Sequence, residues 1–340
     1  METLLTTSAA QRCVAVEDES AIGAARRDAQ LLAAALDFDA TLAGEIAIAV
    51  TEATSNIVRH AQRGELLLRP LQGAEGQALE VLALDRGCGI ADLRASMLDG
   101  VSTAGSAGGG LGAMRRLAAE FDIYTQPGKG TALYMLLRPR AATQSVARMQ
   151  LGVVSLPKHG ETVCGDDWTL QLDGQRALIA VADGLGHGPD AAAAARATLA
   201  PVREAQPYPP GRLLELAHQR ARATRGAALA IAALQPATHS VQFAGIGNIA
   251  ASVCVHDGRR QLISHNGIVG HNMRKAHELL SEWPQGALLV LHSDGLSTQW
   301  DLGSYPGLLL RHPALIAGVL YRDFTRGTDD ATVVVVREAR

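Results

Sequence analysis

Length, composition and charge limit what this chain can be. The sequence has 340 residues, of which 47% are hydrophobic and 19% are charged, and its formal net charge is -3. That length predicts two domains of ordinary size, each able to bury its own core. The small net charge and the lack of a long Lys/Arg run argue against general nucleic-acid binding.

Targeting signals and cysteine spacing favour a cytoplasmic protein. No run of about 18 apolar residues predicts a membrane span, and the N-terminus does not show a signal-peptide pattern. The four cysteines are far apart and form no Cys-x-x-Cys pair, which favours a reducing compartment over a disulfide scaffold or a zinc site. We therefore expect a cytoplasmic location and no membrane partner.

Hydrophobic periodicity in the first half predicts an α+β domain. The expected elements are, in order, helices at 20–36 and 43–61, strands at 65–69 and 79–84, a helix at 113–120, and strands at 121–126 and 131–137. A stretch of small and polar residues after Arg138 places a domain boundary near residue 144. We divide the chain into residues 1–140, a linker at 141–148, and residues 149–340.

The second half predicts many short strands with paired helices, which is an α+β layered pattern. The expected elements are strands at 150–155, 168–172 and 176–182, helices at about 188–203 and 211–224, strands at 227–234, 240–245, 249–255, 261–264 and 286–292, helices near 305–322, and a last strand at 332–337. The two halves do not resemble each other. The predicted fold class is thus α+β with two different domains.

Three polar residues with a spacing of four lie on the second predicted helix. Glu52, Asn56 and His60 therefore share one face of that helix. The amide oxygen of Asn56 can complete the octahedral shell of Mg²⁺, and Glu52 can act as a general base toward an attacking hydroxyl. The alternative interpretation is a solvated polar helix face.

A carboxylate and two glycines follow the strand at 79–84. In Asp85-x-Gly87-x-Gly89 the carboxylate can accept a hydrogen bond from the exocyclic amine of adenine. The glycines let the backbone approach a flat base and take positive φ. An ordinary Asp/Gly turn is the alternative for this piece alone.

Two further glycine-rich segments suit a nucleotide. Gly108-Gly-Gly-Leu-Gly112 leads into a helix, whose first N–H groups bind phosphate well, and the small residues at 100–107 suit a lid. Gly128-Lys-Gly130-Thr131 places a hydroxyl at the start of the last strand. The glycine pattern matches neither a dinucleotide fingerprint nor a Walker A loop.

Together these motifs resemble the GHKL ATPase family, which has the Bergerat fold, over about residues 10–138. Asp99-Gly-Val-Ser-Thr103 and Arg115-Arg-Leu117 look like the RsbT type of serine/threonine kinase more than the anti-sigma RsbW or SpoIIAB type. The resemblance implies an α/β sandwich that uses ATP and Mg²⁺. It implies Glu52 as the catalytic base, Asn56 as the Mg²⁺ ligand and Asp85 as the residue on adenine. The ATP-binding set is completed by Gly87, Gly89, Gly108, Gly110, Gly112 and Thr131.

Acidic residues of the second half fall at the ends of predicted strands. Asp183 and Asp294 each end a strand, Asp329 and Asp330 precede the last strand, and Asp166 lies in an acidic pair after the first. Mg²⁺ and Mn²⁺ prefer oxygen ligands, and two such ions about 4 Å apart can activate a bridging water. For any single Asp-Gly pair, an ordinary turn is the alternative.

The sequences Asp183-Gly-Leu-Gly-His-Gly188 and Asp329-Asp-Ala-Thr332 resemble the metal-dependent PPM phosphatases of the SpoIIE/RsbX branch, over about residues 147–338. The resemblance implies an α-β-β-α sandwich with two ions, either Mn²⁺ or Mg²⁺. The implied metal ligands and contacts are Asp166, Asp183, Gly184 through its carbonyl, Asp294 and Asp329, with Asp330 in support. No arginine stands just before Gly165, where the broader family binds phosphate, and His187 is a candidate for that task.

These resemblances imply a bifunctional partner-switching regulator in signal transduction, such as a stress response. The first domain would phosphorylate a serine or threonine of a partner protein with Mg-ATP, and the second would hydrolyse phosphoserine or phosphothreonine. The implied partner is a STAS-domain anti-sigma antagonist or a stressosome scaffold, with a downstream regulator as a further partner. The alternative is an ATP-dependent module that binds a sigma factor or a STAS protein, with only the phosphatase active.

Overall fold

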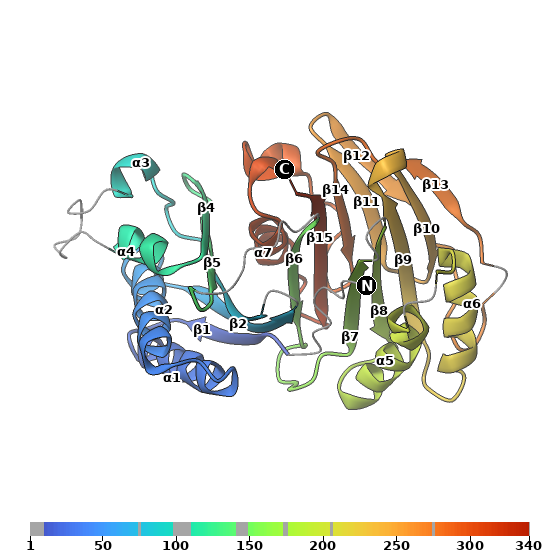
Figure 1. Cartoon of the computed structure of the whole chain (residues 1–340), viewed down its shortest axis with the longest axis horizontal. Coiled ribbons are helices and arrows are strands. Elements are labelled where there is room, and N and C mark those ends of the chain that lie inside the picture. The colour runs from blue at the N-terminus through green and yellow to red at the C-terminus, as the bar shows by residue number, and fades with distance from the viewer. Residues whose placement is uncertain are drawn as a thin grey trace. The chain divides into compact units, whose positions relative to one another are not determined.

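The computed structural model describes residues 10–73, 76–97, 110–140, 149–172, 176–204, 207–273 and 276–339. The chain forms two compact units (Figure 1). The N-terminal unit contains Gln11–Ser145 and Tyr305–Arg322, and the C-terminal unit contains Met1–Ala10, Val146–Ser304 and Asp323–Arg340. Helices and sheets occur in both units, so the predicted two-domain α+β class is confirmed. The predicted linker at 141–148 lies outside the described residues.

One antiparallel five-stranded sheet organises the N-terminal unit, in the order β1-β2-β3-β5-β4. The strands are β1 (Arg12–Val16), β2 (Gly64–Gly73), β3 (Gly76–Asp85), β4 (Glu120–Gln126) and β5 (Gly130–Leu137). The helices before and between them are α1 (Ser20–Ala35), α2 (Ala40–His60), α3 (Leu93–Ser96) and α4 (Gly110–Leu117). Periodicity did not predict β1, because this edge strand buries only Val14 and Val16 on its alternating pattern.

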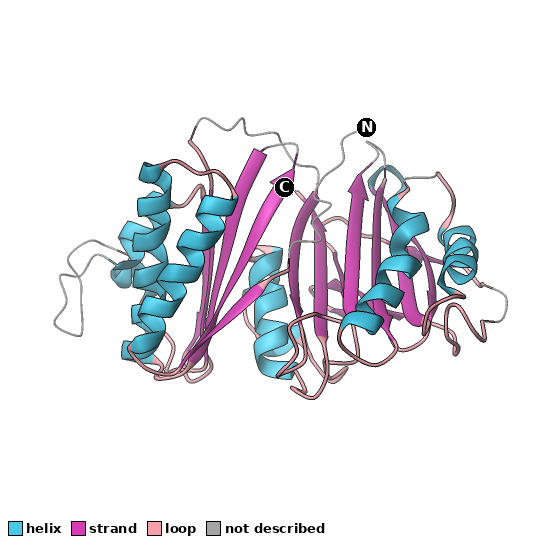
Figure 2. Ribbon diagram, turned by 90° about the horizontal axis from the view of Figure 1, so that it is seen from below, coloured by secondary structure: helices cyan, strands magenta, loops and turns pink. Residues whose placement is uncertain are grey.

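Helices cover one face of this sheet (Figure 2). Small buried side chains on α1, such as Ala25 and Ala29, let this helix pack closely on α2. On α2, Ile46 and Val50 point into the same core as Leu66 and other strand residues. The start of α2 is fixed by Asp39, whose carboxylate accepts a hydrogen bond from Leu42 N–H at 2.8 Å. Burial of this apolar face is what holds α2, and thus its polar side, in place.

The other face of the same sheet packs against a segment from the second half of the chain. The sequence predicts helices near 305–322, but the structure has a 3₁₀ turn, η3 (Leu308–Leu310), and then α7 (Pro313–Phe324). Pro306 and Gly307, with φ of +80°, interrupt the early part, and Pro313 suits the first turn of α7. A Cβ at Gly318 of α7 would lie 2.9 Å from the side-chain Cδ2 of Leu84 of β3, so the helix packs closely on that side chain.

The C-terminal unit contains two five-stranded sheets, in the orders β13-β10-β9-β8-β7 and β12-β11-β14-β15-β6. The first sheet consists of β7 (Asp166–Leu172), β8 (Ala177–Gly184), β9 (Ala227–Gln235), β10 (Ser240–Ile246) and β13 (Leu279–Glu282). The second consists of β6 (Met149–Leu156), β11 (Ala250–Val255), β12 (Gly258–Leu262), β14 (Leu288–His292) and β15 (Ala331–Glu338). Short β13 was not predicted, because its four residues are mostly exposed.

Alternating side chains divide this unit into layers. Ile179 and Phe243 belong to the core shared with Leu289 and Val334 of the other sheet. Residues of the opposite register, such as Ala180, pack on the helices α5 (Pro189–Arg203) and α6 (Pro210–Ala221). Further 3₁₀ turns are η1 (Pro236–Thr238) and η2 (Leu302–Ser304). In the described part of the chain, no helix is both long and apolar enough to cross a membrane.

Gly130 gives a test of the close packing around the end of β3. Its φ is +87°, and a Cβ there would lie 2.1 Å from the carbonyl oxygen of Asp85. We expect Gly130→Ala to lower the free energy of unfolding by about 3 kcal/mol, from steric overlap and backbone strain together. Urea denaturation of the full chain measures this.

Gly128→Ala is the matched control for that substitution. Gly128 also has a positive φ, of +75°, but a Cβ there would meet nothing within 4 Å. Gly128→Ala should lower the free energy of unfolding by only about 1 kcal/mol, because it adds strain from the left-handed backbone but no steric overlap. Equal losses in the two variants would contradict the close approach of Gly130 to Asp85.

Candidate active sites

A cavity of about 450 Å³ in the N-terminal unit collects the polar face of α2. Glu52, Asn56 and His60 all line it, as their spacing of four predicts. Apolar residues of the same helix, including Ile46 and Val50, are fully buried in the core. A Cβ at Gly110 would lie 2.8 Å from Glu52 Oε2, so the start of α4 comes close to this carboxylate. The polar face therefore points into a cavity and is not merely solvated.

Asp85 lies at the end of β3, where it is held by backbone donors. Its Oδ1 accepts hydrogen bonds from Gly87 N–H at 2.8 Å and from Thr131 N–H at 3.1 Å. Burial raises the pKa of this carboxyl, and the two backbone hydrogen bonds oppose that rise. Gly89 has a φ of +72°, and a Cβ there would overlap the carbonyl of Gln126. Only glycine fits this turn beside Asp85.

The cavity brings together most residues of the predicted ATP-binding set. Its lining includes Glu52, Asn56, Asp85, Gly89, Gly110 and Thr131. Apolar side chains, including Ile57, Ile90 and Leu133, form another part of the wall, which suits the faces of a flat base. The assignment of these residues to ATP stays a prediction.

Other predicted residues of this set lie elsewhere. Gly87 packs against Ala61 and the carbonyl of His60, and Gly112 is buried within α4. The helix predicted to begin at Ala113 begins at Gly110, so Gly110 and Gly112 are helical rather than parts of a loop. Gly108 and the predicted lid at 100–107 lie outside the described residues.

A second cavity, of about 460 Å³, lies in the C-terminal unit. Asp183, Asp294 and Asp329 line it, although they come from distant parts of the sequence. Asp183 is near the end of β8, and its register partner on β7 is Asp166. Strand pairing thus places the carboxylates together, because the ends of these strands meet in one region.

Burial and neighbouring charges both disfavour the ionised forms of Asp183 and Asp166. Burial raises the pKa of Asp183 most, and the charges of Asp166, Asp294, Asp329 and Asp330 raise it further. Burial also raises the pKa of Asp166, with a smaller contribution from Asp330 and Asp294. The Oδ2 atom of Asp166 is buried and has no hydrogen-bond partner. A cluster of this kind is stabilised by a cation.

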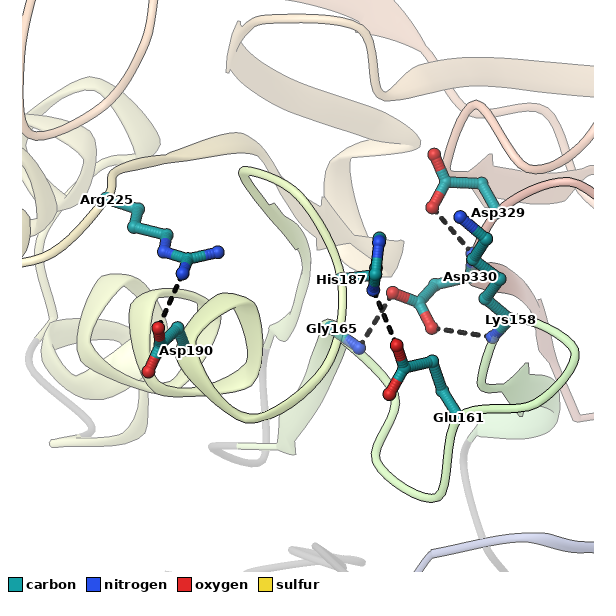
Figure 3. A network of polar contacts seen from close by, with 8 residues as sticks. All are labelled: Lys158, Glu161, Gly165, His187, Asp190, Arg225, Asp329 and Asp330. Carbon is teal, nitrogen blue, oxygen red and sulfur yellow. Dashed lines mark hydrogen bonds and ion pairs between the residues drawn. The ribbon is translucent and has the colours of Figure 1, made fainter.

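Asp330 differs from its neighbours, since backbone groups already satisfy it (Figure 3). Its two oxygens accept hydrogen bonds from Lys158 N–H at 2.8 Å and Gly165 N–H at 3.0 Å. This arrangement ties the loop before β7 to the start of β15. Gly184 packs directly against the backbone of α5, because a Cβ there would overlap the carbonyl of Ala191.

Two contacts around this cavity were missed by the sequence interpretation. Asn248 donates a hydrogen bond from Nδ2 to Asp294 Oδ2 at 2.7 Å. His187 Nδ1 lies 2.6 Å from Glu161 Oε1, so the candidate phosphate-binding histidine already faces a carboxylate (Figure 3). The negative charge of Glu161 disfavours a phosphate at that histidine. In the sequence, Asn248 directly follows the segment Gly245-Ile-Gly247, and this position after a turn was the available signal.

The donor set of the second cavity fits divalent ions. Carboxylate oxygens are the ligands that Mg²⁺ and Mn²⁺ prefer, and the buried Asp166 Oδ2 has no hydrogen-bond partner in the protein. Among the described residues, no three His, Cys, Asp or Glu side chains already converge in the arrangement of a bound ion.

Comparison with known sequences divides the chain in two. Residues 15–137 match the histidine kinase-like ATPase domain family, and residues 173–338 match the family named stage II sporulation protein E (SpoIIE). The serine/threonine-protein kinase RsbT of Bacillus subtilis (strain 168) is 34% identical over 123 residues, which cover 36% of this chain and 92% of RsbT. The phosphoserine phosphatase RsbX of the same organism is 24% identical over 150 residues, covering 44% of this chain and 75% of RsbX.

Solved structures show the same architecture. A structure described as the bacterial stressosome, "a modular system that has been adapted to control secondary messenger signaling", aligns with a TM-score of 0.52 and 27% identity, over 56% of this chain and 100% of that chain. RsbX in complex with magnesium aligns with a TM-score of 0.51 and 22% identity, over 57% of this chain and 98% of that chain. The second likeness shows a shared fold.

Removal of one carboxylate gives a test of the metal cluster. Because the pKa of Asp183 is raised by burial and by repulsion, Asp183→Asn should raise the free energy of unfolding without metal, by on the order of 1 kcal/mol at pH 7. Mn²⁺ at about 100 times its dissociation constant should stabilise the wild-type protein by about 2.7 kcal/mol. The variant should lose most of that gain. Urea denaturation with and without Mn²⁺ measures both effects.

Asp190→Asn is the control, because Asp190 is an exposed acid of α5 that pairs with Arg225 and does not line the cavity (Figure 3). It should respond to Mn²⁺ as the wild-type protein does. A full response to Mn²⁺ in Asp183→Asn would contradict the metal site.

Proposed function

Since the chain belongs to the histidine kinase-like ATPase family represented by RsbT, and joins that domain to a SpoIIE-family domain, we propose that it both attaches and removes phosphate on a partner protein. The observation that carries this proposal is the pair of cavities, each lined by the residues that its own chemistry requires. The first offers a base, an amide oxygen and an adenine acceptor. The second offers a cluster of carboxylates.

In the N-terminal unit, we assign the roles to residues of α2 and β3. Asp85 would accept a hydrogen bond from the adenine amine, and the apolar wall would exclude water from the base. Asn56 would provide an oxygen ligand to the Mg²⁺ of Mg-ATP. Glu52, on the same helix face, would take the proton from the attacking serine or threonine hydroxyl of the partner. Helix α2 sets the spacing of the last two groups.

In the C-terminal unit, Asp183, Asp294 and Asp329 would hold two Mn²⁺ or Mg²⁺ ions, with Asp166 at a metal or a metal-bound water. Gly184 would contribute its carbonyl oxygen. Bound divalent ions supply an activated water and neutralise charge on the phosphate. Asn248 orients Asp294 by its hydrogen bond, and Asp330 fixes the loop before β7. These contacts keep the ligands in place before a substrate arrives.

The partner that we propose is a STAS-domain protein, either an anti-sigma antagonist or a stressosome scaffold. The likeness to RsbT, to RsbX and to a stressosome structure supports this choice. One chain that carries both activities holds each of them at a high effective concentration near the same bound partner. The balance of the two reactions would then set the phosphorylation level of the partner in the cytoplasm.

Glu52→Gln tests the phosphorylating activity. The amide cannot take the hydroxyl proton, so transfer of phosphate from ATP to the STAS partner should fall by about 100-fold or more, while ATP binding persists. Quantitative mass spectrometry of the partner's phosphoserine and phosphothreonine measures the transfer.

Glu45→Gln is the matched control, since Glu45 lies on the same helix, pairs with exposed Arg140 and does not line the cavity. Its transfer rate should equal that of the wild-type protein. If Glu52→Gln transfers phosphate at the wild-type rate, the catalytic role of Glu52 is wrong. If the wild-type protein binds the partner without transfer, the N-terminal unit is instead an ATP-dependent binding module.

Asp294→Asn tests the removal of phosphate. Loss of one carboxylate ligand should lower Mn²⁺-dependent release of inorganic phosphate from the phosphorylated partner by about 100-fold. Colorimetric phosphate release measures this, and Asp190→Asn should retain full activity. ATP binding should not change in Asp294→Asn. Loss of both activities in this variant would contradict two separate sites.

A further inference from the structure

A segment of the second half of the sequence is built into the N-terminal unit. Residues Tyr305–Arg322, which include most of α7, belong to the same compact unit as the cavity that contains Asp85. His312 stacks on Tyr134 of β5 with ring centroids 4.1 Å apart, and its N–H donates to Asp122 Oδ2 at 2.8 Å. Arg311 pairs with the other oxygen of Asp122 at 3.2 Å. These contacts anchor the N-terminal end of α7 on β4 and β5.

The C-terminal end of α7 reaches the edge of the nucleotide cavity. Tyr321 hydrogen-bonds with Glu65 of β2, and Gly318 packs on Leu84 of β3. The next residue along the helix, Arg322, donates a hydrogen bond from NH1 to the carbonyl oxygen of Asp85 at 2.8 Å. Arg322 is 4% exposed. A buried guanidinium therefore holds the peptide whose side chain faces the cavity.

This contact bears on Asp85 in two ways. It fixes the carbonyl of Asp85 from one side, while Gly87 and Thr131 fix the carboxylate from the other. The positive charge of Arg322 also opposes the rise in the pKa of Asp85 that burial causes, as does His60 of α2 to a smaller extent. Both effects favour an ionised, oriented carboxylate, which is the form that accepts a hydrogen bond from adenine.

We propose that Arg322 is a positioning residue of the nucleotide site, supplied by the second half of the chain. The inference depends on the proposed function of the first cavity as an ATP site. Arg322 does not line the cavity and acts through Asp85. The nucleotide site is then complete only when α7 lies on the sheet, so residues 1–140 alone do not contain every group that the site needs.

Arg322→Ala in the full chain tests this inference. The affinity for a fluorescent ATP analogue at pH 8 should fall by about tenfold, because the Asp85 peptide loses its charged donor. Affinity should also begin to fall at a higher pH on acidification than in the wild-type protein, because the pKa of Asp85 rises when Arg322 is removed. His60 is common to both proteins, so the difference between their pH profiles reports Arg322.

Two further substitutions separate positioning from loss of structure. Arg322→Lys keeps the charge and a donor and should recover most of the affinity and the wild-type pH profile. Arg311→Ala removes a cation from the same segment, 3.2 Å from Asp122 and not in contact with Asp85, and should bind like the wild-type protein. Equal loss in Arg311→Ala and Arg322→Ala, or wild-type affinity in Arg322→Ala, would overturn the inference.

A different set of results would contradict the proposed function. Asp85→Asn should abolish binding of the analogue if the cavity is an ATP site. If the wild-type protein does not bind the analogue, or if Asp85→Asn binds it normally, the ATP assignment itself is wrong. If Asp85→Asn abolishes binding and Arg322→Ala does not alter it, only the role of Arg322 is wrong.

Discussion

The C-terminal site depends on holding several aspartates together against their mutual repulsion. Strand pairing places Asp166 opposite Asp183, and the segments after β14 and before β15 bring Asp294 and Asp329 to the same cavity. Burial raises the pKa of Asp183 most, and the charges of the neighbouring carboxylates raise it further. A fold that buries such a cluster gives up stability in the metal-free state, which favours a cation-binding role over a structural one.

Neutral donors around the cluster decide which carboxylates remain available. Asp330 is fully engaged by two backbone N–H groups, and Asn248 engages one oxygen of Asp294. Asp166 retains an unpaired buried oxygen. In the N-terminal site, the carboxylate of Asp85 is held by backbone donors in a pocket that Glu52 also lines. In the proposed roles, the C-terminal site uses a cluster of acids to bind metal, and the N-terminal site uses one carboxylate to accept a hydrogen bond from adenine.

Much of this could be predicted from the sequence, because local patterns carry it. The spacing of Glu52, Asn56 and His60 fixes a shared helix face whatever the tertiary structure, and apolar runs locate most strands. Short edge strands such as β1 bury too few side chains to produce a pattern. The start of α4 at Gly110 was missed because glycine is a poor helix former, and tertiary packing decided it.

Contacts between distant segments could not be predicted from the sequence, for a different reason. Nothing in the residues near Arg322 indicates that its partner is the carbonyl of Asp85, and the same holds for Asn248 with Asp294. Domain division by motif assigns all of α7 to the second half, whereas packing places Tyr305–Arg322 with the first. Such interleaving depends on which faces of a sheet remain uncovered, and hydrophobic periodicity does not tell which segment will cover them.

A single time course tests whether one chain performs opposite reactions on one partner, as we propose. The full chain is incubated with a STAS-domain partner and labelled Mg-ATP, excess unlabelled ATP is then added, and Mn²⁺ follows. If both activities are present, label on the partner rises in the first stage and falls after Mn²⁺ is added. A partner that never acquires label, or that keeps its label after Mn²⁺, would contradict the proposal.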